Sequence, residues 1–483
     1  MKREIALEHV ANRTRLAVIE DGRLCEILYD QSRRRELTGG IYVGRVQNIL
    51  PGMNAAFVDI GANKNAYLAA GDIGIDTRGD AALSDALRSE RIEKRVRPGQ
   101  MLICQVVREP GGAKGPRISQ NITLPGRKLV LLPTLRYAGV SRKITDETER
   151  ARLHKIALEL AENGAGAIVR TAGEGADAAE LAAEYADLTE KWHRIETEAA
   201  ASRTPRRIET ETGFAEAAVR DFLTEDTDAM RTDDPDLFRE LIEAAEKTVP
   251  ALRDRISLVD FETPLFDLLR VDAQIEEALA RRVNLKSGGT IVIDETEAMT
   301  VIDVNTAKFV GKTDLEETVF RLNCEAAEEI ARQARLRDLG GIIIIDFIDM
   351  ENPANREALT VFLRKQFARD RNRTTVLGMT ELGLMQVTRK KLRRPLGRIL
   401  ARECPLCGGS GTVLSVEETA HQAVRELWRR RRRGDTTKYR IVAGEGVAAC
   451  IREIGLDDEN VRVQTARRNG YEIVPEDGKG ETT

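Results

Sequence analysis

The chain has 483 residues, of which 42% are hydrophobic and 32% charged, and its formal net charge is −4. This length exceeds what one hydrophobic core supports and predicts two to five domains. No apolar run approaches the roughly 20 residues that span a bilayer, and no apolar segment follows the charged start, so we expect no membrane span, no secretory signal and a cytoplasmic location.

Short strands between glycine-rich turns are predicted over the first hundred residues. Asp21-Gly22 separates two strand-like stretches, 14–20 and 23–29, and is a strong hairpin signal. Further short strands between residues 39 and 107 are typical of a small β-barrel. A polar, partly helical insertion at 72–98 interrupts them.

Aromatic and cationic residues accompany the predicted barrel. Phe57 and Tyr67 lie on its strands, and Lys114 lies in a glycine-rich turn. Barrels of this kind bind single-stranded nucleic acid by stacking bases on aromatic rings beside cations. Aromatic residues in strands also serve a hydrophobic core, so both interpretations stay open.

From residue 124 the pattern changes to strands mixed with helices, among them helices near 146–162 and 178–203. Arg170 and Thr171 follow a predicted strand at 165–169. A guanidinium beside a hydroxyl suits a terminal phosphate, although an arginine in a loop is often simply solvated.

Two later strands end in acidic residues. In the strand at 299–304, Asp303 shares one face with Asn305, opposite apolar neighbours. Four isoleucines at 342–345 predict a strand buried on both faces of a parallel or mixed sheet, and this strand ends at Asp346. Open α/β sheets place their chemistry just beyond the carboxyl ends of such strands.

A helix is expected between these two strands, because Thr313 and Glu316 form a capping box, and Asn352-Pro353 predicts the start of the next helix. Carboxylates at the two strand ends suit Mg²⁺, which proteins hold through one or two carboxylates plus phosphate oxygens and water. An asparagine amide there can donate to a scissile phosphate. The alternative is that such acids are ordinary turn residues, a role that fits Asp294 and Asp349 better.

Of the six cysteines, only Cys404 and Cys407 are close in sequence, and glycines follow them. Structural zinc takes about four ligands, so this motif is half of a zinc site whose other half would come from a second subunit. A redox pair or a turn without metal are the alternatives. The basic stretches 389–402 and 429–433 are either solvated faces or contacts for a phosphate backbone.

Together these motifs resemble the RNase E/G family of bacterial endoribonucleases over essentially the whole chain. The most specific segments are 285–300, 303–306, 340–350 and 404–411. The chain length favours the shorter, RNase G type of member over the type with a long disordered C-terminal scaffold.

The resemblance implies a multidomain α/β (α+β) fold. Its expected parts are a split RNase H-like domain (1–35 and 210–280), an inserted S1 (OB-fold) β-barrel (36–123), a 5′ sensor (124–209), a DNase I-like catalytic domain (281–400), a zinc link (401–415) and a small C-terminal domain (416–483).

The resemblance also implies site roles. Asp303 and Asp346 would hold Mg²⁺, and Asn305 would contact the scissile phosphate. The residues implied for a 5′ monophosphate pocket are Gly126, Val130, Arg170, Thr171 and Arg373. The implied RNA contacts are Phe57, Tyr67 and Lys114. Cys404 and Cys407 would share Zn²⁺ between the subunits of a homodimer or of a tetramer.

The implied activity is Mg²⁺-dependent, single-strand-specific endonucleolytic cleavage in rRNA processing and mRNA decay. A 5′ monophosphate would stimulate it, and the products would carry 5′-phosphate and 3′-hydroxyl ends. The alternatives are a catalytically silent RNA-binding scaffold, an RNase E-type enzyme without its tail, and a metal-dependent phosphatase or DNase.

Overall fold

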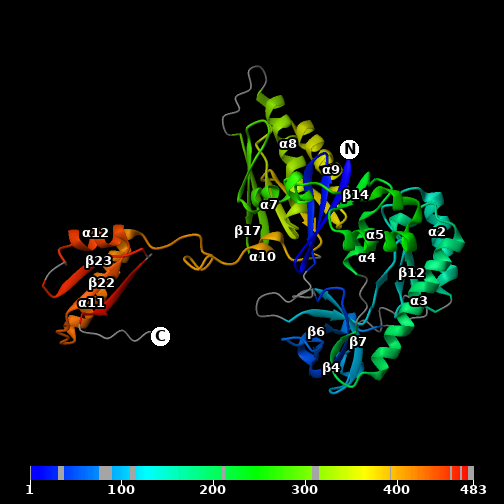
Figure 1. Cartoon of the computed structure of the whole chain (residues 1–483), viewed down its shortest axis with the longest axis horizontal. Coiled ribbons are helices and arrows are strands. Elements are labelled where there is room, and N and C mark those ends of the chain that lie inside the picture. The colour runs from blue at the N-terminus through cyan, green and yellow to red at the C-terminus, as the bar shows by residue number, and fades with distance from the viewer. Residues whose placement is uncertain are drawn as a thin grey trace. The chain divides into compact units, whose positions relative to one another are not determined.

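The computed structural model forms two compact units, Met1–Ile399 and Leu400–Thr483 (Figure 1). The residues that the structure describes are 2–30, 37–74, 90–108, 115–162, 164–208, 213–306, 315–391, 393–456, 459–467 and 470–476. Within these ranges no helix combines the length and the apolar content needed to cross a membrane.

A five-stranded sheet joins the start of the chain to a segment more than two hundred residues later. Its order is β15-β14-β1-β2-β3, and β1 runs parallel to β14. The strands are β1 (Arg3–Val10), β2 (Arg13–Glu20), β3 (Arg23–Tyr29), β14 (Ala229–Thr232) and β15 (Ile256–Leu258). The predicted hairpin is confirmed, since Asp21 and Gly22 have φ values of 48° and 79°, as a tight β2–β3 turn requires.

Helices pack on this sheet to form one buried cluster, which includes Ile5, Leu7, Val219 and Leu241. The helices of this region are α4 (Phe214–Phe222), α5 (Pro235–Thr248), α6 (Leu265–Leu268) and α7 (Val271–Leu279). Figure 1 shows α4 and α5 beside β14.

The predicted small β-barrel is confirmed. Five strands follow one another in the order β4-β5-β6-β8-β7, and β4 pairs with β7 to close the ring. The strands are β4 (Ile41–Leu50), β5 (Ala55–Asp59), β6 (Ala66–Ala69), β7 (Met101–Arg108) and β8 (Arg117–Ser119). Much of the expected insertion, residues 75–89, lies outside the described residues.

The barrel continues into a four-stranded sheet of order β11-β12-β10-β9. Ile41 and Val43 of the barrel belong to the same buried cluster as Leu129 and Leu181. The elements are β9 (Leu124–Pro125), β10 (Leu129–Leu132), β11 (Ala138–Val140), α2 (Glu147–Ala161), β12 (Gly166–Val169) and α3 (Ala178–Ala201). After α3, β13 (Arg206–Ile208) pairs with β4 and returns the chain to the barrel.

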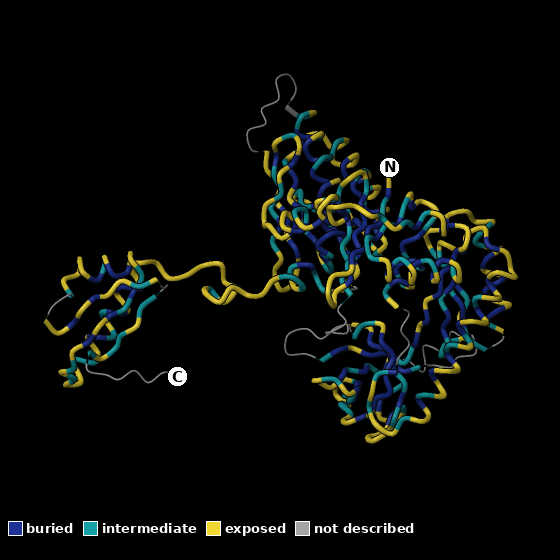
Figure 2. Tube along the Cα trace, viewed as in Figure 1, coloured by how far each residue is buried: buried dark blue, intermediate teal, exposed yellow. Residues whose placement is uncertain are grey.

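A mixed six-stranded sheet, β16-β17-β18-β19-β21-β20, carries the acidic strand ends. Its strands are β16 (Arg282–Asn284), β17 (Thr290–Glu295), β18 (Met299–Asn305), β19 (Gly341–Asp346), β20 (Thr374–Met379) and β21 (Leu384–Arg389). The helices α8 (Leu315–Leu336) and α9 (Pro353–Phe367) pack on it (Figure 2). The predicted start of α9 is confirmed, because Asn352 accepts a 2.9 Å hydrogen bond from Ala354 N, whereas Thr313 lies outside the described residues.

The expectation that the isoleucine strand is buried on both faces is wrong. Ile343 and Ile345 are fully buried under α8 and α9, whereas Ile342 on the opposite face is 47% exposed. Four consecutive apolar residues occupy both faces of a strand, but the described helices that pack on this sheet share one face. The other face, where Asp346 lies, is open.

Helix α8 is also anchored to the first sheet through buried arginines. Arg335 donates to Glu20 at 2.6 Å and to Glu26 at 2.9 Å, and Arg332 donates to the Leu24 carbonyl at 2.6 Å. Arg335 is only 8% exposed. A buried charge needs a partner, and the two glutamates provide it.

The second unit has its own small core. It contains a sheet of order β23-β22-β24 and two longer helices. Its elements are α11 (Val416–Arg432), β22 (Tyr439–Ala443), α12 (Glu445–Glu453), β23 (Val461–Thr465) and β24 (Tyr471–Pro475), and the short α10 (Leu396–Leu400) precedes them.

Candidate metal and phosphate sites

Two aspartates meet at the carboxyl ends of neighbouring parallel strands. The register pairs Asp303 of β18 with Asp346 of β19, and adjacent strands lie about 4.8 Å apart. Burial alternates along β18, so that Asp303 and Asn305 are exposed while Ile302 and Val304 are buried. The structure therefore brings all three candidate catalytic residues to one open face, with α8 as the crossover between the strands.

These residues fit a magnesium ion. Asn305 Nδ2 donates to Asp303 Oδ2 at 2.7 Å, and no described arginine, lysine or histidine forms an ion pair with Asp303 or Asp346. The described part of the chain holds no cluster of three or more histidine, cysteine or acidic side chains arranged for a metal. Two carboxylates alone suffice for Mg²⁺ when water and phosphate oxygens complete its shell.

Asp294 has the structural role expected of it. The Arg281 guanidinium donates to both carboxylate oxygens, and this hydrogen bonding lowers the pKa of Asp294. Asp349 is exposed beyond the end of β19.

Arg170 lies directly after β12 and is already engaged on both sides. Its guanidinium donates to the Gly126 carbonyl, and its Nη2 donates to Asp221 Oδ1 at 3.0 Å. A Cβ at Gly126 would lie 2.3 Å from Glu184 Oε1 and 3.0 Å from the Leu129 carbonyl oxygen, so a larger residue there would displace the Glu184 carboxylate. The hydrogen bond from Arg170 to the Gly126 carbonyl holds the Gly126 turn close to Arg170.

Two more of the predicted phosphate-binding residues lie near Arg170, Val130 on the sheet of β12 and Thr171 at the start of the short 3-10 turn after β12. Val130 of β10 pairs with Ile168 of β12, and the Thr171 hydroxyl lies 3.0 Å from that of Ser141. Arg373 comes from elsewhere, one residue before β20, and is exposed. Among the described residues no hydrogen bond or ion pair joins it to the other four.

The loop before Arg373 nevertheless contacts Lys143, which lies between β11 and α2, and Phe222 of α4. Lys143 Nζ donates to the Asp370 carbonyl at 2.8 Å, and the Arg371 guanidinium lies 3.9 Å from the centre of the Phe222 ring. Residues from α4, from the sheet of β12 and from the loop before β20 therefore gather in one region.

Asp221, which binds the Arg170 guanidinium, is a residue of this region that the sequence pattern does not reveal. Burial alone raises its pKa, but hydrogen bonds from Arg220 and the charge of Arg170 outweigh this and lower it to about 2. It lies 51 residues from Arg170 on a helix with no motif around it. Only the tertiary fold brings the two together.

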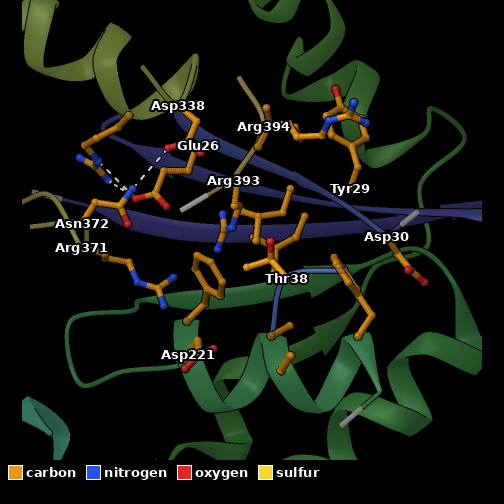
Figure 3. A pocket seen from close by; sticks show the side chains of 18 of the residues that line it. Glu26, Tyr29, Asp30, Thr38, Asp221, Asp338, Arg371, Asn372, Arg393 and Arg394 are labelled. Carbon is orange, nitrogen blue, oxygen red and sulfur yellow. Dashed lines mark hydrogen bonds and ion pairs between the residues drawn. The ribbon is translucent and has the colours of Figure 1, made fainter. Parts of the chain in front are cut away.

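Arg170 and Asp221 lie on the wall of a pocket of about 700 Å³ (Figure 3). The wall also includes the end of β3 and residues 370–372. Gly126, Val130, Thr171 and Arg373 are not part of this wall. The pocket is therefore adjacent to the predicted 5′ phosphate residues and distinct from most of them.

The two barrel aromatics are cross-strand partners. Phe57 of β5 faces Tyr67 of β6, with ring centres 6.5 Å apart and planes at 70°. Both are partly exposed, so their rings are available for a base to stack on. Lys114 lies outside the described residues.

The cysteine motif forms an exposed turn. Gly408 N donates to the Cys404 carbonyl at 2.9 Å, and Ser410 N donates to the Cys407 carbonyl at 3.0 Å. Backbone N–H groups of Gly411 and Gly409 lower the pKa of the Cys407 thiol. A favoured thiolate and an open turn suit one half of a zinc site.

Comparisons with known proteins agree on one family. The model of the Ribonuclease E/G family matches residues 123–392. The chain is 40% identical to Ribonuclease G of Escherichia coli K12 over 94% of this chain and 93% of that protein. It is 41% identical to Ribonuclease G of Haemophilus influenzae, over 88% and 87% respectively. It is 34% identical to Ribonuclease E of E. coli K12, over 99% of this chain and 45% of that protein.

Proposed function

This chain belongs to the ribonuclease E/G family and is an endoribonuclease, and we propose that it hydrolyses single-stranded RNA in an Mg²⁺-dependent reaction at Asp303 and Asp346. The observation that carries the proposal is the register of β18 and β19, which sets two exposed carboxylates side by side. The intact acidic pair also argues against a catalytically silent RNA-binding scaffold.

Asp303 and Asp346 would hold Mg²⁺, which would supply a Lewis acid to polarise the phosphodiester and to make water a better nucleophile. One Asn305 N–H is held by Asp303, which orients the amide so that its second N–H donates to the scissile phosphate and stabilises charge in the transition state. In-line attack by water on phosphorus expels the 3′ oxygen of the upstream nucleotide, which leaves a 3′-hydroxyl and a 5′-phosphate.

We further propose that the RNA 5′ end is sensed at Gly126, Val130, Arg170, Thr171 and Arg373. A monophosphate fits a small site with a guanidinium and a hydroxyl better than a bulkier triphosphate does. The 5′ phosphate exchanges with or joins Asp221 at Arg170, so a 5′-monophosphorylated RNA is bound and cleaved faster.

Phe57, Tyr67 and Lys114 bind the strand through stacking and charge, as barrels of this kind do. Stacking on exposed rings requires unpaired bases, which favours single-stranded regions. We propose precursor rRNA and mRNA as the substrates.

We also propose that Cys404 and Cys407 bind Zn²⁺ together with the same pair from a second copy. Each chain offers two adjacent thiols, while structural zinc takes four ligands. The product is a homodimer, which can assemble further into a tetramer.

The test of the activity compares A/U-rich RNA oligonucleotides that carry a 5′ monophosphate or a 5′ hydroxyl, and a DNA strand of the same sequence. We expect cleavage of RNA alone, faster with the monophosphate, and none after Mg²⁺ is chelated. Mass spectrometry of the fragments should show 5′-phosphate and 3′-hydroxyl ends. Cleavage of DNA, or release of terminal phosphate without chain cleavage, would favour the DNase or phosphatase alternative.

The test of the zinc link is native mass spectrometry of wild type and of a Cys404→Ser, Cys407→Ser double variant. We expect one Zn²⁺ per two chains in the wild type and loss of both the metal and the dimer in the variant. Replacement of Cys450, which lies in α12, by serine is the control. Unchanged assembly together with a zinc-free wild type would refute the link.

A further inference from the structure

The pocket in Figure 3 is lined by more arginines than carboxylates. Its lining includes eight arginines, Arg170, Arg207, Arg220, Arg335, Arg371, Arg389, Arg393 and Arg394, and five acids, Glu26, Asp30, Asp221, Asp338 and Asp370. No lysine lines it. An excess of guanidinium groups around one cavity needs an explanation, because unpaired like charges repel.

Most of these charges are compensated within the fold. Arg335 binds Glu26, Arg389 binds both Asp338 and Asp370, and Asp221 is shared by Arg170 and Arg220. Asp30 and Arg207 have interactions of their own. These groups form the structural wall of the pocket.

Three arginines remain. Among the described residues, no hydrogen bond or ion pair engages the side chain of Arg371, Arg393 or Arg394. The Arg371 guanidinium lies over the Phe222 ring, 3.9 Å from its centre. Loss of water lowers the pKa of Arg371, Glu26 and Asp221 raise it, and the charge of Arg393 lowers it. Figure 3 shows Arg371 and Arg393 next to each other.

We propose that this pocket is a phosphate-binding site in which Arg371, Arg393 and Arg394 hold the phosphate group. Arginine presents a planar fork of donors that matches phosphate oxygens, and it gives up water more readily than lysine. A cavity of about 700 Å³ is within the range that binds nucleotide-sized ligands. The phosphate belongs either to an RNA chain or to a free phosphate ester.

The site is separate from the proposed 5′ sensor. Thr171 and Arg373 do not line the pocket, and the one shared residue, Arg170, is already neutralised there by Asp221. The proposal therefore holds whether or not the chain senses 5′ ends, and it requires no cleavage.

The test uses the full chain without divalent metal, so that RNA is bound and not cut. The variants are Arg371→Met, whose stem still covers Phe222, Arg393→Gln, Arg394→Gln and the triple combination. The matched control is Arg369→Gln, an exposed arginine on the same loop that does not line the pocket. Far-UV circular dichroism checks folding, and the single variants carry the test if the triple variant does not fold.

Three probes distinguish the sources of phosphate: inorganic phosphate, uridine monophosphate and a ten-nucleotide oligouridine with 5′-hydroxyl. Calorimetry measures binding of the first two, and fluorescence anisotropy measures the third. We expect the triple variant to lose at least tenfold in affinity for one or more probes, and the Arg369→Gln control to match the wild type.

If the oligonucleotide alone is affected, the ligand is RNA, and the slope of log affinity against log salt should fall by about 0.7, the value for loss of one phosphate contact on a single strand. If monophosphate or inorganic phosphate is affected, the ligand is a free phosphate ester. Equal affinities of the triple and control variants for all three probes overturn the proposal. Cleavage by the same variants with Mg²⁺ is read separately, so failure here leaves the proposed nuclease activity standing.

Discussion

Two pairs of aspartates lie at opposite ends of the six-stranded sheet, and the protein treats them differently. Arg389 of β21 donates to Asp338 at 2.6 Å and to Asp370 at 2.7 Å, and Asp370 is 3% exposed. At the other end, Asp303 and Asp346 are register partners on an exposed face. The only described side chain that hydrogen-bonds to this second pair is the amide of Asn305.

The difference separates a structural use of aspartate, at Asp338 and Asp370, from the metal-binding use that we propose for Asp303 and Asp346. Two carboxylates about 5 Å apart repel each other by roughly 1–3 kcal/mol, depending on the effective dielectric. The pair of Asp338 and Asp370 is compensated by the buried Arg389, which makes it part of the fold. The exposed pair keeps its repulsion, which is relieved when a cation binds from solution, and this favours a metal site over a turn.

The largest expected effect is loss of cleavage in Asp303→Asn and in Asp346→Asn. Each substitution removes one of the two carboxylates, and we expect at least about 10³-fold slower RNA cleavage, or about 4 kcal/mol of barrier. The free energy of unfolding without metal should be unchanged or slightly higher, since repulsion is removed. Cleavage assays and urea unfolding measure both. If both variants still cleave RNA, Asp303 and Asp346 are not the catalytic metal ligands.

Asp370→Asn should have the opposite profile. It removes the more buried of the two counter-charges of Arg389, which Arg389 contacts through two nitrogens, and breaking a buried ion pair costs about 3–5 kcal/mol of unfolding free energy. Urea unfolding measures the loss, and cleavage by the remaining folded protein should persist. Asp254→Asn is the control, because its side chain is 96% exposed and such surface pairs contribute about 0–1 kcal/mol. Equal losses in the two variants would contradict the structural role of Asp370.

Asp221 lies between these extremes, because its charge is shared by Arg170 and Arg220 at a pocket wall. Its pKa of about 2 is below the value of about 3.9 for an unfolded chain, so its charge stabilises the fold by roughly 2 kcal/mol above pH 4. This contribution is lost as the pH falls from about 4 to 2. Unfolding of Asp221→Asn should therefore differ from wild type at pH 7 and converge with it near pH 2. A constant difference across this range would show that the side chain acts through packing instead of charge.

The strands that carry the acidic residues could be predicted because their signals are local in the sequence. Alternation along residues 299–305 placed Asp303 and Asn305 on one face, and the glycine–isoleucine run located β19, because both signals lie within a few residues. The alternation could not tell which face helices cover, so the exposure of Ile342 was missed.

Long-range pairing was beyond the sequence pattern. Arg389 belonged to a basic stretch that suggested a solvated face or a phosphate contact, yet it is 5% exposed and bound to two aspartates from distant loops. Asp221 meets Arg170 only because α4 lies next to β12's sheet. Periodicity also could not show that β1 pairs with β14, because pairing partners far apart leave no local trace.

The ion pairs of α8 have a consequence for trimming the chain. Arg335 reaches Glu20 and Glu26 on the first hairpin, while the same helix connects the strands that end in Asp303 and Asp346. A shortened protein that begins after residue 30 would leave Arg335 as a cation without its two acidic partners, inside the crossover helix between the strands of Asp303 and Asp346. The first hairpin thus supports the helix that connects the two strands of the proposed metal site, although the hairpin and those strands are far apart in the sequence.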